Sequence, residues 1–428
     1  MIAALLEGIG VTVAPAVLAA AEHAQPLLER RDPRTTAVHA RVLRAFLEEG
    51  VAESDLAGTT GYGYDDPARD RYESLLARVF RAERVLARLS IVSGTHAIVA
   101  GLDALVPAGA TLLAANGAPY DTLRHAIATA PHALVTRGAI YREVPRALDG
   151  TTDLGALRAA VRETRPAVVF VQRSRGYAAR SSLTIDAIGA LVEVVRAEHP
   201  EAIIFVDNCY GELVEEREPL EVGADVLAGS LIKNVGGGLA PTGGYLAGSA
   251  ALIEWMATRI FAPGIGAGLG PTLGFGRTLV QGLFYAPQVV AATLRGLDFA
   301  AALFAELGYA VDPAPGEPRT DIVQAIRLGS RELLVAFARG LQRAMPLNAR
   351  FAPEPGPVPG YVDPVIMSSG SFVSGATIDL SCDAPLRAPF EVYLQGGVSA
   401  EHAALGAVLA ADAVYSAAVS GVSSPMKP

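Results

Sequence analysis

Between about residues 88 and 250, the chain alternates short, continuous apolar runs with longer stretches in which apolar residues recur at helical spacing. The apolar runs are Leu89–Val92, Thr111–Ala114, Ala167–Val171, Ala202–Val206, Asp225–Leu227 and Gly244–Ala247. A strand that is apolar along its whole length is typically buried on both faces, and helices between such strands are typical of a parallel sheet. The pattern therefore predicts an α/β fold with a mainly parallel sheet that is covered by helices on both sides.

The segments on either side of this region have different patterns. Residues 1–55 show the spacing of helices, and an amphipathic helix is predicted from Ala68 to about Arg81. The C-terminal part combines predicted helices with strand-like runs and a proline-rich stretch, which indicates a smaller α+β domain. We therefore predict a helical segment 1–55, a large domain 56–290 and a small domain 291–428.

Composition limits the classes of function. The chain has 428 residues, is 51% hydrophobic and carries a net charge of -9. An acidic protein lacks the basic face that nucleic-acid binders need, so we predict a soluble cytoplasmic protein that binds no nucleic acid. Two long uncharged runs, on either side of Arg277, are interrupted by Gly or Pro, so we interpret them as buried or interface segments and predict no membrane association. The N-terminus lacks the basic start of a signal peptide.

The chain has two cysteines, Cys209 and Cys382, which is too few for a disulfide framework. Two separate buried thiols are the favoured interpretation, and a bridge between them is the alternative.

A carboxylate and an amine follow two of the predicted strands. Asp207 ends the Ile-Phe-Val run, and Lys233 lies in the mostly apolar segment Leu227–Asn234. A carboxylate and a lysine at such strand ends are what a pyridoxal 5'-phosphate (PLP) enzyme needs, since the lysine binds the aldehyde as a Schiff base and the carboxylate keeps the pyridine nitrogen protonated. Asp207 could instead cap a helix or bind a metal, but no His or Glu cluster with ligand spacing lies nearby, so no metal is predicted. Lys233 could be a surface charge, or the glycines after it could form a phosphate loop, although no G-x-x-x-x-G-K-[ST] motif occurs.

Two further turns follow predicted strands and have side chains that could serve a cofactor. Ser93-Gly94-Thr95 precedes an apolar helix, whose N-terminal N–H groups could bind a phosphate, and the Ser93 and Thr95 hydroxyls add donors. His96 could have a direct role at the site, or it could equally cap the helix or lie on the surface. Tyr120 follows the next strand, at the sheet edge where α/β proteins bind ligands, and its ring could stack on a flat cofactor. Taken alone, Tyr120 is more readily interpreted as a core or interface residue.

Taken together, these segments resemble fold-type I PLP enzymes of the Cys/Met-metabolism group. Within that group the chain is similar to the branch of methionine gamma-lyase-like and cystathionine beta-lyase-like aluminium resistance proteins. The segments that carry the resemblance are Thr60–Asp66, Ser93–His96, Val171–Tyr177, Val206–Tyr210, Gly223–Asn234, Gly236–Tyr245, Pro385–Phe390 and Gln395–Gly397. They occur in order over about residues 55–400, which makes the set far more specific than any single motif.

The resemblance implies the fold-type I architecture, with a mainly parallel seven-stranded sheet flanked by helices and a smaller C-terminal α+β domain. It implies that Lys233 forms the internal aldimine and moves protons, that Asp207 pairs with the pyridinium nitrogen, and that Tyr120 stacks on the ring and assists the leaving group. The residues implied in phosphate binding are Ser93, Gly94, Thr95 and Ser230.

Two further implications concern the neighbouring subunit and the substrate. Tyr62 or Tyr64 would reach the active site of a neighbouring subunit, which implies a dimer or tetramer with shared active sites. The substrate carboxylate would bind Arg387, with Arg173 and Arg180 as alternatives, because guanidinium groups bind carboxylates through two hydrogen bonds. Any of the three arginines could instead be a structural ion-pair partner.

The sequence departs from the better-known transsulfuration enzymes at three points. Ile232 stands where they have Thr before the lysine, Tyr64 stands where they have Arg in a Tyr-x-Arg triplet, and Val235 replaces a Pro that is frequent in the branch. The implied function is a carbon–sulfur lyase that performs β- or γ-elimination on a small amino acid. The alternatives are γ-replacement, aldol cleavage or elimination of a non-sulfur leaving group in specialised biosynthesis, or a regulatory protein without turnover.

Overall fold

A computed structural model of the chain describes residues 1–30, 32–147 and 149–421. It divides into two compact units: a large unit, Thr36–Pro287, and a small unit that combines Met1–Thr35 with Gln288–Pro428. The division differs from the predicted boundaries because the first helices pack on the C-terminal helix: Ala14 N–H donates to the Asp412 carboxylate over 2.8 Å. The sequence pattern of residues 1–55 shows only that they are helical, so it could not assign them to a unit.

The large unit contains a seven-stranded sheet. Its strands are β1 (Arg84–Arg88), β2 (Thr111–Ala114), β3 (Ile140–Glu143), β4 (Val168–Gln172), β5 (Ile203–Asp207), β6 (Val226–Ser230) and β7 (Gly244–Gly248). Its longer helices are α5 (Pro67–Phe80), α6 (Gly94–Leu105), α7 (Asp121–Ala128), α8 (Leu154–Thr164), α9 (Ile185–Glu198) and α10 (Ala250–Ile260). Helix α4 (Pro33–Glu49) begins in the small unit, and helix α11 (Gly276–Glu306) ends there.

The strand order is β1-β7-β6-β5-β4-β2-β3, with parallel pairing from β6 to β3 and antiparallel pairing at β7 and β1. The predicted mainly parallel sheet is confirmed, and five of its strands lie at the predicted runs. The first prediction was wrong: Leu89–Val92 forms a turn, and the strand comes before it. Arg88 misled the pattern because its buried guanidinium donates to the carbonyl groups of Ala267 and Leu269, which a strand-like apolar run does not reveal.

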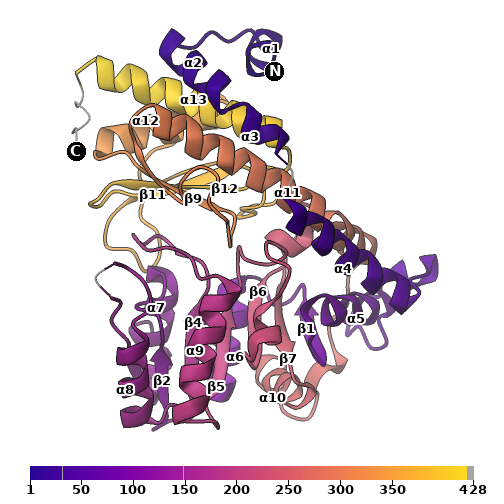
Figure 1. Cartoon of the computed structure of the whole chain (residues 1–428). Coiled ribbons are helices and arrows are strands. Elements are labelled where there is room, and N and C mark those ends of the chain that lie inside the picture. Colours follow the sequence, from indigo (N-terminus) through magenta and orange to yellow (C-terminus); the bar gives the residue numbers. More distant parts are fainter. Residues whose placement is uncertain (31, 148, 422–428) are drawn as a thin grey trace. The chain divides into compact units, whose positions relative to one another are not determined.

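Helices cover both faces of this sheet. One buried core joins Phe170, Phe205 and Leu246 of the strands to apolar residues of α6, α7 and α10. Ile204 and Val206 flank Phe205 and are also buried, so they point to the opposite face, since neighbouring residues of a strand alternate. In Figure 1, α9 lies in front of the strands and α6 behind them. This layering brings the carboxyl ends of the parallel strands to one edge, where the candidate residues follow β5 and β6.

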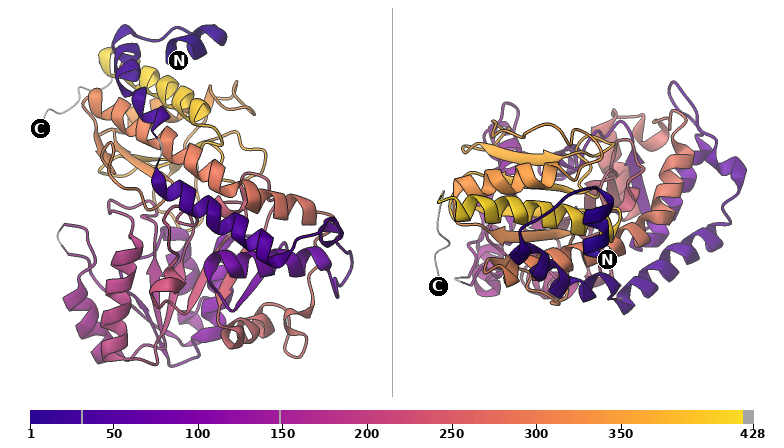
Figure 2. Two further views of the ribbon diagram at one scale, coloured as in Figure 1. Left: turned by 45° about the vertical axis from the view of Figure 1, so that its right-hand side comes forward. Right: turned by 90° about the horizontal axis from the view of Figure 1, so that it is seen from above.

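The small unit has its own antiparallel sheet, in the order β10-β11-β12-β9-β8. Its strands are β8 (Ala310–Asp312), β9 (Val323–Arg327), β10 (Val365–Ser369), β11 (Ser381–Pro385) and β12 (Glu391–Gln395), and its helices are α1 (Ile2–Gly8), α2 (Pro15–Ala24), α3 (Pro26–Glu29), α12 (Arg331–Gln342) and α13 (Ala400–Val419). Helices α12 and α13 run side by side (Figure 2), and α12 contacts β10 and β11. The predicted α+β character of this region is confirmed.

Helix α11 is longer than the pattern predicts, because it continues through Pro287. A proline normally interrupts a helix by removing a hydrogen bond, and the sequence pattern indicates only buried or interface segments on either side of Arg277. By length and composition, α11 and α13 could each cross a membrane, but 72% of the apolar window in α11 and 50% of that in α13 is buried inside the protein. Burial of this kind also occurs in core helices of water-soluble proteins, so membrane association is not indicated by these helices alone.

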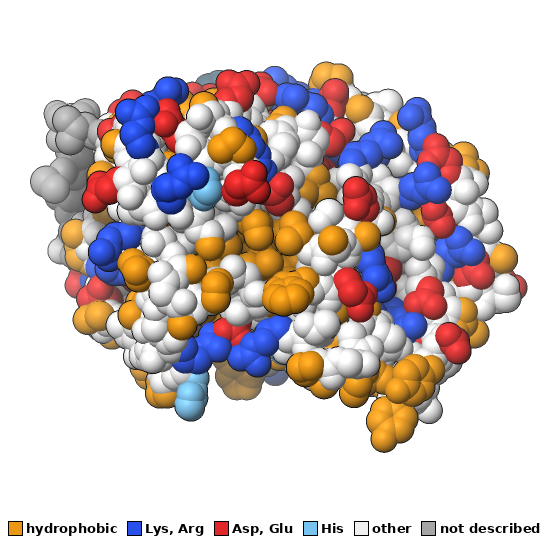
Figure 3. Space-filling view, turned by 90° about the horizontal axis from the view of Figure 1, so that it is seen from below, with side chains coloured by type: hydrophobic (Ala, Val, Ile, Leu, Met, Phe, Trp, Pro, Cys, Tyr) orange, Lys and Arg blue, Asp and Glu red, His pale blue; other side chains and the backbone are white. Residues whose placement is uncertain are grey.

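Charges of both signs share the surface. On the face shown in Figure 3, basic and acidic side chains are interspersed around hydrophobic ones. A nucleic-acid-binding surface concentrates Lys and Arg instead. The predicted lack of nucleic-acid binding stays a prediction that this face is compatible with.

Candidate active site

Asp207 ends β5 in the middle of the parallel sheet, and its carboxylate is almost entirely buried. Its Oδ1 accepts the Cys209 N–H over 3.1 Å. Burial raises the pKa of Asp207 to about 6, although hydrogen bonds from Cys209 and the positive charges of Lys233 and Arg180 act in the opposite direction. Burial disfavours the charged form of this carboxylate, and a nearby cation or a protonated nitrogen would stabilise that form.

The turn after Asp207 has an unusual backbone. Tyr210 has φ 73° and Leu213 has φ 63°, which lie in the left-handed region that non-glycine residues seldom adopt. Such residues cost about 1–3 kcal/mol each unless the surroundings hold them. Here Asn234 Nδ2 donates to the carbonyl groups of Tyr210 and Glu212, over 2.9 and 2.8 Å, and thereby fixes the turn.

Lys233 lies in the loop after β6, directly before Asn234, and is half-buried. Its Nζ donates to the Tyr210 hydroxyl over 3.0 Å and lies 4.1 Å from the centre of that ring. Asn234 therefore ties the lysine loop to the turn that follows Asp207. The buried side-chain amide of Asn234 thus fixes the position of the Lys233 loop relative to the turn after Asp207.

This arrangement leads to a first expected result. Asn234→Ala should lower the free energy of unfolding by about 2–4 kcal/mol, because two hydrogen bonds are lost and two carbonyl groups lose their donor. Denaturant unfolding measures the change, with Gln281→Ala as a control, since Gln281 is an exposed amide with one bond to Tyr285. An Asn234→Ala variant as stable as the control would show that these two hydrogen bonds do not hold the turn.

The start of α6 lies against the same edge. The Ser93 hydroxyl accepts the His96 N–H over 3.0 Å and so caps the helix, while the His96 side chain is exposed. A side chain at Gly94 would meet Cys209 Sγ at 3.1 Å and Ser230 Cβ at 3.2 Å. A side chain here would require these neighbours to shift by a few tenths of an ångström, so glycine favours the close approach of the helix N-terminus. The remaining N–H groups at this helix end form a cradle that suits a phosphate group.

Tyr120 joins this cradle to the carboxylate. Its hydroxyl shares a 2.6 Å hydrogen bond with Thr95 Oγ1, and its N–H donates to Gln172 Oε1 over 2.9 Å. Burial raises the pKa of Tyr120 well above its usual value, and the charge of Asp207 adds to the shift. The structure thus brings together the predicted Ser93, Gly94, Thr95, Tyr120, Asp207, Ser230 and Lys233.

The candidate arginines have different environments. Arg173 is fully buried, with Nη1 donating to Asn208 over 2.8 Å and Nη2 to Glu215 over 3.1 Å, which favours a structural ion pair. Arg180 is buried too, donates to the carbonyl groups of Arg175 and Asn116, and its charge acts on Asp207.

Arg387 lies in the small unit between β11 and β12, with Cζ 5.8 Å from the centre of the Tyr361 ring. Its predicted contact with the substrate carboxylate stays a prediction.

Tyr62 and Tyr64 point outward from a firmly held loop, with 76% and 60% of their surface exposed. The buried Asp66 carboxylate holds this loop by accepting the N–H groups of Thr59 and Thr272, both over 2.8 Å. Burial alone would raise the pKa of Asp66, but these and other hydrogen bonds lower it to about 2. A fixed loop that presents two tyrosines to the outside is compatible with the predicted contact with a neighbouring subunit.

Sequence reasoning missed several residues that the structure places at this site. Tyr210 and Asn234 were quoted only as parts of motifs, and Cys209 was considered only as a thiol that could form a bridge. Both cysteines are free and buried. Over the described ranges, 1–30, 32–147 and 149–421, no group of three or more His, Cys, Asp or Glu side chains could hold a metal.

One compositional signal could have singled out Lys233. The chain has only two lysines, Lys233 and Lys427, among 35 Lys and Arg residues. Arginine replaces lysine readily as a surface charge but cannot form an imine at neutral pH, because its guanidinium stays protonated. A lysine kept at a strand end in such an arginine-rich chain is therefore a strong indication of amine chemistry.

Comparison with known proteins identifies the family. The family model described as methionine gamma-lyase matches residues 14–415. The chain belongs to this family. It is 43% identical over 368 residues to the uncharacterised protein YnbB of Bacillus subtilis, covering 85% of this chain and 87% of the relative.

Solved structures narrow the branch. The carbon–sulfur lyase involved in aluminium resistance from Clostridium novyi is 37% identical, with a TM-score of 0.89 over 95% of this chain and 97% of the other. The candidate cystathionine beta-lyase involved in aluminium resistance from Clostridium acetobutylicum is 38% identical, with a TM-score of 0.90 over 96% and 97%. The cystathionine gamma synthase of Xanthomonas oryzae is only 19% identical, with a TM-score of 0.57 over 90% and 99%, and shares the fold. The predicted family branch and the fold-type I architecture are confirmed.

Proposed function

We propose that this protein is a PLP-dependent carbon–sulfur lyase that performs β- or γ-elimination on a small amino acid. The observation that carries the proposal is the placement of Asp207 and Lys233 after adjacent parallel strands, with the Gly94 cradle and Tyr120 beside them. The family is one of PLP-dependent enzymes, and the residues present fit this cofactor. The names of the similar clostridial proteins support the choice of a lyase.

Each pole of the site has a role towards PLP. Lys233 Nζ would hold the aldehyde carbon, Asp207 would accept a hydrogen bond from the protonated ring nitrogen and keep it protonated, and Tyr120 would lie on the ring. The N–H groups at the start of α6, with Thr95 and Ser230, would hold the phosphate. When bound, PLP supplies an electron sink for bond cleavage next to the amino group.

The protein's own groups would move the protons. The Lys233 amine, once free, would accept the proton from the substrate Cα and could return it at the next carbon. The Tyr210 hydroxyl orients Nζ, and the Tyr120 hydroxyl can protonate the departing thiolate. Water then releases ammonia and a 2-oxo acid.

The Tyr210 hydroxyl offers a test of this proton transfer. Tyr210→Phe keeps the ring under Nζ and removes the 3.0 Å hydrogen bond, so kcat should fall about tenfold to a hundredfold. The protein should still bind PLP, because no proposed cofactor contact is removed. Steady-state rates and PLP titration measure the two effects, and an unchanged kcat would exclude the orienting role.

Product analysis tests the reaction class. The PLP-loaded protein is given cystathionine, methionine, cysteine and homocysteine. The expected products are a 2-oxo acid and ammonia, with a thiol from cystathionine or methionine and hydrogen sulfide from cysteine or homocysteine. Formation of a new amino acid without release of ammonia would contradict elimination and would favour γ-replacement or aldol cleavage. Absence of turnover on a broad amino-acid panel would favour a regulatory protein.

We also propose that Tyr62 or Tyr64 completes the active site of a neighbouring subunit in a homodimer or homotetramer, in the cytoplasm. Subunits carrying Lys233→Ala and subunits carrying Tyr62→Ala with Tyr64→Ala are unfolded together, mixed and refolded. A shared site predicts that the inactive parents yield up to about a quarter of native activity, since about half of the pairs are mixed and each mixed pair contains one intact site of two. Mixtures as inactive as both parents would contradict shared sites.

A further inference from the structure

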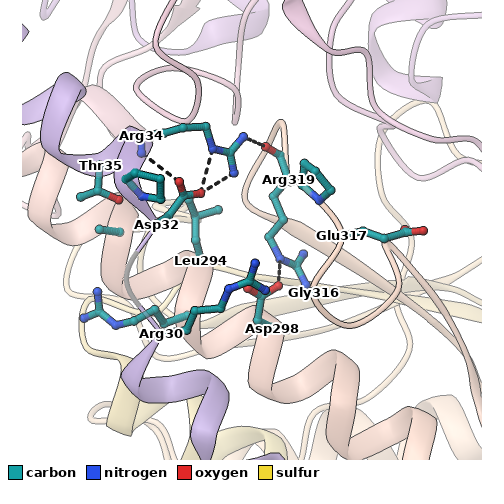
Figure 4. Close-up of a pocket in the computed structure, with 13 residues that line it drawn as sticks. Arg30, Asp32, Arg34, Thr35, Leu294, Asp298, Gly316, Glu317 and Arg319 are labelled. Carbon is teal, nitrogen blue, oxygen red and sulfur yellow. Dashed lines mark hydrogen bonds and ion pairs between the residues drawn. The ribbon is translucent and has the colours of Figure 1, made fainter.

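Arginine side chains gather around a pocket in the small unit. The pocket has a volume of about 320 Å³, which is at the lower end for small-molecule sites. Its walls come from the first turn of α4 and the residues just before it, from the second half of α11 and from the loop before β9 (Figure 4). Four arginines line it: Arg30, Arg34, Arg295 and Arg319. The acidic residues in the lining are Asp32, Asp298 and Glu317.

Two of these carboxylates are already engaged. Asp32 accepts the N–H and the Nε of Arg34 over 2.9 and 2.8 Å, and Asp298 accepts Nε of Arg319 over 2.6 Å. Arg34 Nη1 also donates to the carbonyl group of Arg319 over 3.0 Å, so the two pairs are joined, as the dashed lines of Figure 4 show. These bonds leave little acceptor capacity in the pocket.

Donor capacity remains. Within the part of the chain that the structure describes, Arg30 and Arg295 make no hydrogen bond or ion pair with a carboxylate, although the charge of Arg30 acts on Asp32, and Arg319 Nη1 is buried without an acceptor. Glu317 is exposed and accepts the Ala314 N–H over 2.8 Å. A backbone atom of Gly316 lies close to Arg30, since a side chain there would come within 3.2 Å of Arg30 Nη1.

We propose that this pocket binds a small phosphorylated molecule through Arg30, Arg295 and Arg319. Guanidinium groups donate paired hydrogen bonds to phosphate oxygens. Four arginines against three acidic residues leave the lining with a net positive charge, and a phosphate oxygen would also accept a hydrogen bond from the buried Nη1 group. The volume exceeds that of a bare phosphate, which leaves room for the rest of a small organic phosphate or for a pyrophosphate. All lining residues belong to the unit that lacks Lys233, so the proposal does not rest on the lyase activity.

Both chain crossings between the two units come close to this pocket in sequence. Thr35 and Ala291 line it, and the chain passes between the units after Thr35 and before Gln288. A ligand that joins the segment before α4 to α11 would therefore stabilise the small unit where the chain leaves it. Binding should raise the Tm as well as release heat.

Calorimetric titration of the PLP-loaded full chain with pyrophosphate tests the proposal, because PLP loading fills the phosphate cradle near Gly94. The native protein should bind pyrophosphate with a one-to-one stoichiometry. The double variant Arg30→Ala with Arg295→Ala should weaken the Kd at least about tenfold, since each charge-assisted bond contributes roughly that factor. Arg84→Ala is the control, because Arg84 is a half-exposed arginine of the large unit, paired with Glu254, and should leave the Kd within about twofold.

Several results would overturn the proposal. These are no saturable heat with native protein up to about 10 mM pyrophosphate, or equal Kd values for the native protein and the double variant. If succinate bound as tightly as pyrophosphate, the pocket would not be specific for phosphorylated molecules and would bind small anions in general. If the double variant fails to fold, the Tm of native protein with pyrophosphate and with succinate decides between the same outcomes.

Discussion

The Lys233→Ala variant is expected to lose the absorption band at about 420 nm that a PLP-loaded lysine gives, and to lose at least about a thousandfold in turnover. The amine is the covalent holder of the cofactor and the base that takes the Cα proton in our proposal. Its side chain makes a 3.0 Å hydrogen bond to Tyr210 and is half-buried, so its removal should change the stability of the fold by about 1 kcal/mol or less.

The small number of lysines makes this experiment unusually clean. Lys427→Arg removes the only other lysine and should leave both band and activity unchanged. Lys233→Arg keeps the charge and should be as inactive as Lys233→Ala, because a guanidinium cannot form the imine. A Lys233→Ala protein that keeps the band would refute the assignment of the lysine.

The Asp207→Asn variant is expected to separate stability from activity. The raised pKa of Asp207 means that the folded protein binds this proton more tightly than the unfolded chain does. Its ionisation therefore destabilises the cofactor-free protein. The free energy of unfolding should fall as the pH rises from about 4 to about 6, and the full loss, on the order of 3 kcal/mol, should be present above that window.

Asparagine has a similar shape and no charge to bury, so the cofactor-free Asp207→Asn protein should be more stable than the native one at pH 7 by up to about 2–3 kcal/mol, with the difference vanishing near pH 4. The PLP-loaded variant should nevertheless be less active than the native protein. Because the ring nitrogen loses its carboxylate partner, turnover should fall at least about a hundredfold. Denaturant unfolding of the cofactor-free proteins between pH 4 and pH 8, with steady-state rates of the loaded ones, measures both. A variant that is less stable at pH 7 than at pH 4 relative to native protein would contradict the buried charge.

Much of the sheet could be predicted because its parallel strands are buried along their whole length. Strand β3 (Ile140–Glu143) escaped prediction because it lies at the edge, where burial alternates with exposure and two of its four residues are charged. The continuous α11 escaped because Pro287 interrupts the local signal while tertiary packing sustains the helix. Local pattern predicts elements whose burial is uniform and fails where packing overrides it.

The two residues proposed to bind the cofactor could be predicted from the sequence, but the residues that hold them in position could not. Asp207 and Lys233 stand at strand ends, where spacing and chemistry identify them. The supports, such as the Asn234 amide that holds the left-handed turn at Tyr210, depend on contacts across 24 residues of chain. Such contacts leave no periodic trace in a single sequence.

Reduction of the PLP-loaded protein with borohydride, followed by peptide mapping, directly tests whether Lys233 is the residue that binds PLP covalently. Borohydride converts a lysine–PLP imine into a stable amine, and only two lysines are available. We expect one pyridoxyl group per chain, on the peptide that contains Lys233. Labelling of Lys427, or no labelling of a protein that has been given PLP, would contradict it.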